Sequence, residues 1–123
     1  MAILNAPSGL VLSLAANGFT PSIGIPMKTQ FYTGQGGISL LLNFTSGASL
    51  TAGVQISNDP LSNPNNTIAQ QNSARWNPHS VLTNLTASQS SSIVFPVYAL
   101  RLAVTNWSSG TAYLDIGVLD YQL

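Results

Sequence analysis

Charged side chains are scarce in this sequence. Its 123 residues include three basic and three acidic residues, so 5% of the chain is charged, against about 25% in an ordinary domain. Nucleic acid and anionic membrane surfaces are both bound through clustered Lys and Arg side chains. Lys28, Arg75 and Arg101 are the only cations, and they are dispersed along the chain. We therefore expect neither nucleic acid nor a membrane among the partners.

The scarcity of charge also bears on self-association. The formal net charge is zero, and copies of such a chain repel one another weakly and tend to associate. One interpretation is that Ser, Thr, Asn and Gln keep a free monomer soluble; the other is that much of the surface is covered in an assembly. The positive mean hydropathy of +0.25 favours the second. We expect a homo-oligomer, either a dimer or a trimer, with closed symmetry.

The residues that carry catalysis and metal binding are missing too. Cysteine is absent, which excludes disulfides and thiolate metal sites. The single His, His79, and the three Asp residues show no metal-ligand spacing. No Gly-x-Ser-x-Gly motif accompanies them, and the glycines of 34–37 are not followed by the Lys-Ser/Thr of a phosphate loop. The sequence therefore predicts no enzyme, no metal and no cofactor, with His79 as a structural residue.

Long apolar runs are also lacking. None approaches the roughly 20 residues that span a bilayer. Residues 9–16 faintly resemble the apolar part of a signal peptide, but the first cation is Lys28, so no basic residue precedes them. We expect no signal peptide.

Alternation of apolar and polar residues is the dominant pattern. A period of two places each apolar set on one face, as a strand of a sheet requires. The clearest runs are 38–44, 50–57, 100–105 and 112–119, and further strands are expected at 10–15, 29–33, 81–85 and 93–97. About eight short strands predict an all-β fold, an antiparallel β-sandwich of jelly-roll type with essentially no helix.

Turn-forming residues separate the clearest runs. Thr45-Ser46-Gly47 and Ser108-Ser109-Gly110 each predict a β-hairpin. The second hairpin would bring Arg101 beside Asp115 as a cross-strand pair. The alternative is that Arg101 reaches a carboxylate of a partner protein.

Two segments stand apart from the strands. Residues 1–20 are apolar and uncharged, which predicts either an N-terminal arm or an edge strand, with residues 21–123 as one β-sandwich domain. Residues 58–74 are polar and contain two prolines, so they form either a binding loop or a flexible insertion. The candidate interface residues are Ile3, Leu4, Leu10, Leu12, Trp76 and Arg101. Trp76 is expected either to pack over one end of the sandwich or to bind a partner.

Several pieces of the second half resemble small virion proteins of tailed bacteriophages. They are Val54–Asp59, Trp76 with His79, Pro96-Val97, Arg101–Thr105 and Ser109-Gly110-Thr111. The resemblance implies a capsid cement or decoration protein that is made in the host cytoplasm and binds the major capsid protein, or another virion protein, on the capsid surface. It implies no catalytic residue. The alternative is a receptor- or glycan-binding module displayed on the virion, with Trp76 and Tyr32 as candidate sugar-stacking residues.

Overall fold

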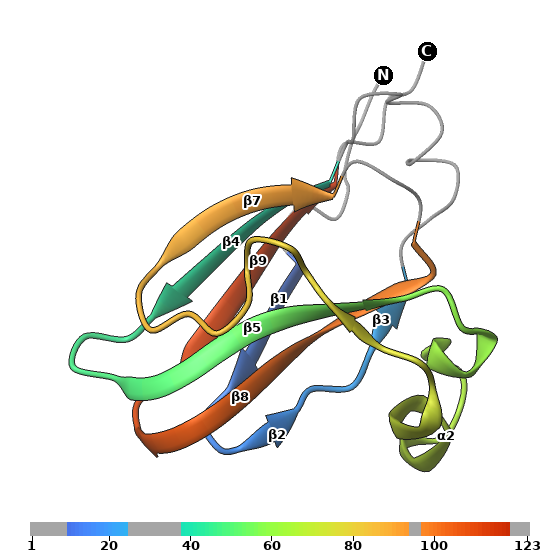
Figure 1. Ribbon diagram of the computed structural model, residues 1–123, viewed down its shortest axis with the longest axis horizontal. Helices are drawn as coiled ribbons and strands as arrows, with labels where there is room; N and C mark the ends of the chain where they lie inside the picture. Colours follow the sequence, from blue (N-terminus) through green and yellow to red (C-terminus); the bar gives the residue numbers. More distant parts are fainter. Residues whose placement is uncertain (1–9, 25–37, 94–96, 119–123) are drawn as a thin grey trace.

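The computed structural model describes residues 10–24, 38–93 and 97–118. Strands dominate these ranges, with one 3-10 helix and one short α-helix between them (Figure 1). The elements are β1 (Leu10–Leu14), β2 (Gly18–Phe19), β3 (Ile23–Gly24), β4 (Ile38–Phe44), β5 (Ser49–Ser57), η1 (Pro60–Ser62), α2 (Ile68–Ser73), β6 (Asn77–Pro78), β7 (Gln89–Ile93), β8 (Ala99–Ser109) and β9 (Ala112–Val118).

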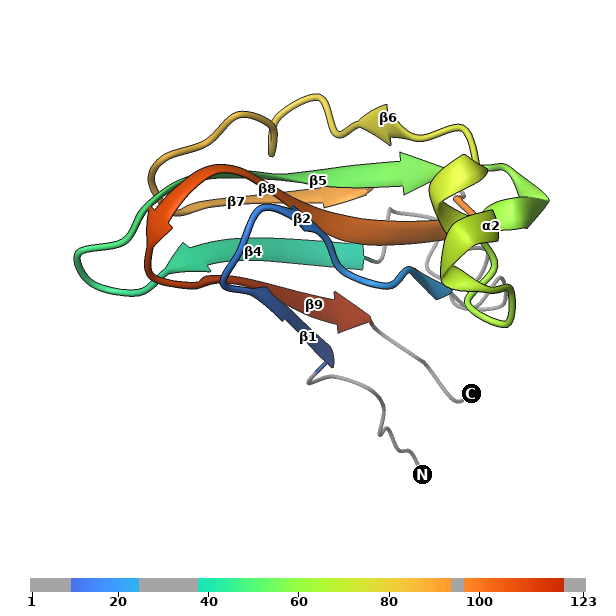
Figure 2. The ribbon, with the colours of Figure 1, turned by 90° about the horizontal axis from the view of Figure 1, so that it is seen from below.

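The strands form two antiparallel sheets that face each other (Figure 2). Sheet A has the strand order β1-β9-β4-β7. Sheet B has the order β2-β8-β5-β6, and β3 pairs with a second stretch of β8. Because β2 and β3 pair with the same strand, they share one strand position.

The connectivity is that of a jelly roll. β1 pairs with β9, β2 and β3 with β8, β4 with β7, and β5 with β6. The chain is thus one long antiparallel ribbon, folded back between β5 and β6 and rolled into two four-position sheets, which is the eight-strand jelly-roll arrangement. The predicted all-β sandwich of jelly-roll type is confirmed.

The core lies between the two sheets and follows the predicted alternation. On β4, for example, Ile38, Leu40 and Leu42 are buried while Ser39 and Leu41 are exposed. Every second residue of β5, β8 and β9 faces the same interior. The buried cluster consists of Ile38, Leu40, Leu42, Leu50, Ala52, Val54, Leu82, Ile93, Val97, Leu100, Leu102, Val104, Ala112, Leu114 and Ile116.

The two predicted hairpins were wrong. β4 and β9 belong to sheet A, whereas β5 and β8 belong to sheet B, so both short connections cross from one sheet to the other. The connections lie side by side: the Thr45 N–H donates to the Thr111 carbonyl at 3.0 Å, and the Thr111 N–H to Thr45 Oγ1 at 3.0 Å. Gly47 and Gly110 have φ values of 77° and 89°, a conformation that glycine adopts without strain. A short turn can join facing sheets as well as neighbouring strands, and alternation does not distinguish them.

The weaker strand predictions had mixed outcomes. The strand expected at 10–15 is confirmed as β1. Residues 81–85 form no strand but one isolated bridge, between Leu85 and Ala52, while Leu82 enters the core. Of the strand expected at 93–97, Ile93 ends β7 and residues 94–96 lie outside the described residues. The start of β7 was not predicted, because its three serines interrupt the apolar alternation. Residues 29–33 lie outside the described residues.

The polar stretch 58–74 contains helical structure that was not predicted. η1 begins at Pro60, and α2 follows after a turn. A capping box starts α2: Thr67 Oγ1 accepts from the Gln70 N–H at 3.2 Å, and Gln70 Oε1 accepts from the Thr67 N–H at 3.0 Å. The Thr-x-x-Gln spacing was a usable sequence signal, although α2 has only six residues.

Candidate functional site

Two of the predicted interface residues meet on the outer face of sheet B. Arg101 points outward from β8, and its guanidinium lies between two aromatic rings. Its Cζ atom is 3.8 Å from the centroid of the Phe19 ring and 4.2 Å from that of Trp76. Such stacking is attractive because the negative face of each ring meets a cation.

Neutral amides complete the surroundings of Arg101. Its Nε donates to Gln55 Oε1 at 2.8 Å, and Nη1 donates to Asn72 Oδ1 at 2.9 Å. The side chain is 4% exposed. Burial lowers the pKa of Arg101 to about 10, so the group stays charged at neutral pH. Arg101 thereby ties β2, β5, β8 and α2 together.

The predicted pairing of Arg101 with Asp115 is wrong. The two residues lie in different sheets, because β8 and β9 are not neighbours. Asp115 is opposite Val11 on one side and Leu41 on the other, and it accepts a 3.4 Å hydrogen bond from Asn43 Nδ2. The error follows directly from the hairpin that the short turn was taken to form.

Trp76 packs at one end of the sandwich, beside α2. Its indole Nε1 donates to the Gln71 carbonyl at 2.7 Å, while its ring covers Arg101. Both the polar and the aromatic parts of the side chain therefore have contacts within the fold. Tyr32, the other candidate for sugar stacking, lies outside the described residues.

The remaining interface candidates belong to the first residues of the chain. Ile3 and Leu4 lie outside the described residues. Leu10 begins β1, which is the end strand of sheet A among the described strands. Leu12 is half-buried and packs against the core, so within this fold its side chain contributes to the interior.

The outer face of sheet A carries exposed apolar side chains that were not predicted as interface residues. Val11 is 51% exposed, Leu41 41% and Tyr113 38%. Val11 and Leu41 flank Asp115 on neighbouring strands, and Tyr113 lies two residues away on β9, a diagonal spacing within reach of an aromatic side chain. Asp115 is the one charged residue on this face among the described residues. The surrounding positions are small or neutral: Ser13, Ser39, Asn43, Ser90, Ser92 and Gly117.

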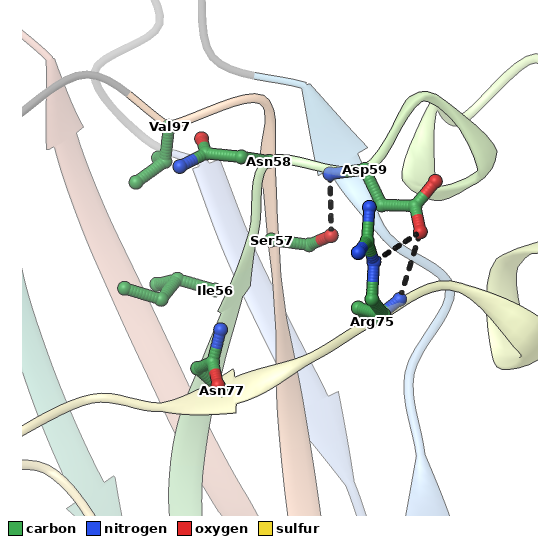
Figure 3. Close-up of a pocket in the computed structure, with 7 residues that line it drawn as sticks. All are labelled: Ile56, Ser57, Asn58, Asp59, Arg75, Asn77 and Val97. Carbon is green, nitrogen blue, oxygen red and sulfur yellow. Dashed lines mark hydrogen bonds and ion pairs between the residues drawn. The ribbon is translucent and has the colours of Figure 1, made fainter.

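A polar recess opens where β5 ends (Figure 3). It has a volume of about 460 Å³. Ile56 and Val97 form its apolar part, and the carboxamides of Asn58 and Asn77 lie at its border. Asn77 is held opposite Ile56 by the pairing of β6 with β5.

An ion pair closes one side of the recess. Asp59 Oδ2 accepts from the backbone N–H of Arg75 at 3.1 Å and from its Nε at 3.4 Å, and Oδ1 accepts from the Leu61 N–H at 3.0 Å (Figure 3). The hydrogen bond from the Leu61 N–H, and to a smaller extent the one from the Arg75 N–H, hold the pKa of Asp59 below its ordinary value. The Arg75 side chain is 88% exposed, so its outer nitrogens face solvent.

Both ring nitrogens of His79 form hydrogen bonds with backbone groups. Its Nδ1 accepts from the Val81 and Leu82 N–H groups at 3.0 and 3.1 Å, and its Nε2 is 2.9 Å from the Ser92 carbonyl. This arrangement requires the tautomer with the proton on Nε2. The buried ring joins the end strand of sheet A to the segment beside β5.

The described part of the chain offers neither a metal-binding cluster nor a membrane-spanning helix. Residues 10–24, 38–93 and 97–118 contain no group of three or more His, Cys, Asp or Glu side chains that could hold a metal ion. No helix in this part of the chain is long and apolar enough to cross a membrane. Comparisons with protein-family models, with curated proteins and with solved structures return no match for this chain, so its function has to be inferred from the chemistry of its own residues.

Proposed function

We propose that the protein is a structural virion protein of a tailed bacteriophage, a capsid cement or decoration protein that attaches by the outer face of sheet A. The observation that carries the proposal is the exposure of Val11, Leu41 and Tyr113 around Asp115, the one charged residue that the described strands place on this face. Exposed apolar side chains that gather on one face among polar residues are typical of a protein interface.

The fold and the composition support the same proposal. Jelly rolls build viral capsid proteins as well as lectins and cupins, and the choice among these functions depends on the site rather than the fold. A surface with so few charges suits contact with another protein better than contact with nucleic acid. The partner we propose is the major capsid protein.

The chemistry of the face defines what the partner must present. Fully burying an exposed aliphatic or aromatic side chain contributes about 1.5–3 kcal/mol, so three half-exposed side chains contribute roughly 2–4 kcal/mol together. Strands are already ordered, which keeps the entropic cost of docking low. Asp115 must meet a Lys or Arg of the capsid protein, because a buried unpaired carboxylate is strongly unfavourable. Repetition over the particle multiplies a modest affinity per copy.

Binding to shells of the major capsid protein encoded in the same genome tests the proposal. Leu41→Lys introduces a cation at the centre of the face without disturbing the core, because Leu41 is exposed. Ile68→Lys is the matched control, since Ile68 is 52% exposed on α2. We expect the Leu41 variant to bind at least about tenfold more weakly, equivalent to about 1.4 kcal/mol, and the Ile68 variant to bind normally. Equal binding by both variants, or no binding of the unmodified chain to shells, would overturn the proposal.

A further inference from the structure

The recess at the end of β5 has polar groups with unused hydrogen-bonding capacity. The side chains of Asn58 and Asn77 and the two outer nitrogens of Arg75 make no hydrogen bond with any described residue. All three residues line the same recess (Figure 3). Carboxamides and a guanidinium supply donors in several directions, and the carboxamides also supply acceptors.

We propose that this recess binds one neutral sugar ring of a glycan, with Asn58, Asn77 and the Asp59–Arg75 pair contacting its hydroxyls. The proposal is independent of the capsid function, because it uses none of the residues on the outer face of sheet A. A binding site with these residues was not found from the sequence, in which Trp76 and Tyr32 were the sugar-stacking candidates.

The balance of charge favours a neutral ligand. Asp59 and Arg75 are 3.4 Å apart and cancel each other, so an anion attracted by the guanidinium would also meet the carboxylate. A hydroxyl suits the pair better, because it can accept from Arg75 and donate to Asp59. Each carboxamide likewise both donates and accepts, as sugar hydroxyls do.

The shape and the apolar lining agree with this assignment. The recess of about 460 Å³ lies within the range of roughly 300–1,000 Å³ that small-ligand sites occupy. Ile56, which is half-buried, offers an apolar surface for the C–H face of a pyranose, and the buried Val97 lies behind it.

The backbone that carries these polar groups is fixed before any ligand arrives. Asn77 is paired with Ile56 in the sheet, and the turn after β5 is held by the Asp59 N–H, which donates to Ser57 Oγ at 3.0 Å. Fixed backbone of this kind reduces the ordering cost of binding.

NMR titration of the full-length chain tests the site. The probes are the methyl pyranosides of glucose, galactose, mannose and N-acetylglucosamine, each raised to about 100 mM, at which a millimolar Kd gives nearly complete occupancy. We expect at least one probe to shift the backbone amides of residues 56–59, 75 and 77, with a millimolar Kd. Asn58→Ala and Asn77→Ala should each weaken binding about two- to tenfold, the loss expected for one hydrogen bond. Asn65→Ala is the matched control, because Asn65 is exposed and lies outside the recess, and it should bind normally.

Four outcomes would overturn the assignment. They are the absence of a shift with every probe, shifts located elsewhere on the protein, recess shifts that persist unchanged in both Asn variants, and a stronger response of the same amides to sodium acetate, which would indicate an anion site. The spectrum of each variant without ligand shows whether it is folded. Capsid binding can fail while this titration succeeds, and the reverse, so the two proposals stand or fall separately.

Discussion

Arg101 offers the sharpest test of how sheet B and α2 are held together. Its guanidinium is buried between Phe19 and Trp76 and donates to Gln55 and Asn72. Replacing Arg101 with alanine removes all four contacts at once, and it leaves the two amides without their cationic donor.

The magnitude follows from these contacts. A hydrogen bond to a charged group contributes about 1.5–3 kcal/mol, and a cation–π contact about 0.5–2 kcal/mol, so two of each contribute roughly 4–10 kcal/mol. Burial of the charge offsets part of this stabilisation. The pKa falls from 12.5 to about 10, and at about 1.4 kcal/mol per pKa unit the offset is about 3 kcal/mol. We expect Arg101→Ala to lower the free energy of unfolding by about 4 kcal/mol.

Two companion variants separate packing from charge. Arg101→Met keeps an unbranched stem between the rings and also removes the cost of burying a charge, so it should lose only about 1 kcal/mol. Arg101→Lys keeps the charge but lacks the planar fork, so it should be less stable than the Met variant.

Urea unfolding followed by tryptophan fluorescence measures all three variants, because Trp76 lies 4.2 Å from the guanidinium carbon. A loss of less than about 1 kcal/mol in the free energy of unfolding of the Ala variant would refute the reasoning. It would mean that the cost of burying the Arg101 charge cancels the contacts that its guanidinium makes. A Lys variant as stable as wild type would show that the planar shape of the guanidinium is unimportant for stability.

Three further changes probe other parts of the fold. Gly53→Ala should cost about 1–3 kcal/mol in a urea titration, because its Cβ would lie 2.9 Å from the Thr83 Cα; unchanged stability would mean that the neighbouring segment yields easily. His79→Ala should cost about 2–4 kcal/mol, since two backbone N–H groups lose their acceptor, and a neutral result in the same assay would exclude that role. The pKa of Asp59 is lowered from its ordinary value of 3.8, chiefly by the hydrogen bond from the Leu61 N–H. The Asp59 carboxylate therefore stabilises the fold at pH values above 3.8, and this contribution is lost as the pH falls through the lowered pKa. Thermal unfolding should therefore show a smaller acid-induced decrease in Tm for Asp59→Asn than for wild type, and equal decreases would contradict this.

The candidate sites were only partly visible in the sequence. Leu41 interrupts the alternation of its strand and Tyr113 occupies the polar phase of its own, so both could have been recognised as apolar residues on an outer face. Nothing comparable marked Asn58 or Asn77, which are ordinary residues of a polar stretch. They become a candidate site only because β6 returns beside the end of β5.

What the sequence by itself determined is the class of fold and the side chains that fill its core. A period of two assigns each residue of a strand to a face, and that assignment holds for β4, β5, β8 and β9 whichever strands are neighbours. The tertiary structure decided the neighbours. The same short turns can close a hairpin or cross between sheets, and here they cross. That choice separated Arg101 from Asp115 and gave it Gln55 and Asn72, which are 46 and 29 residues away in the chain. Contacts between residues so far apart in the chain depend on how the whole ribbon folds into two sheets. Several different strand pairings would bury the same apolar side chains in the core. Only the complete pair of sheets selects one of these pairings.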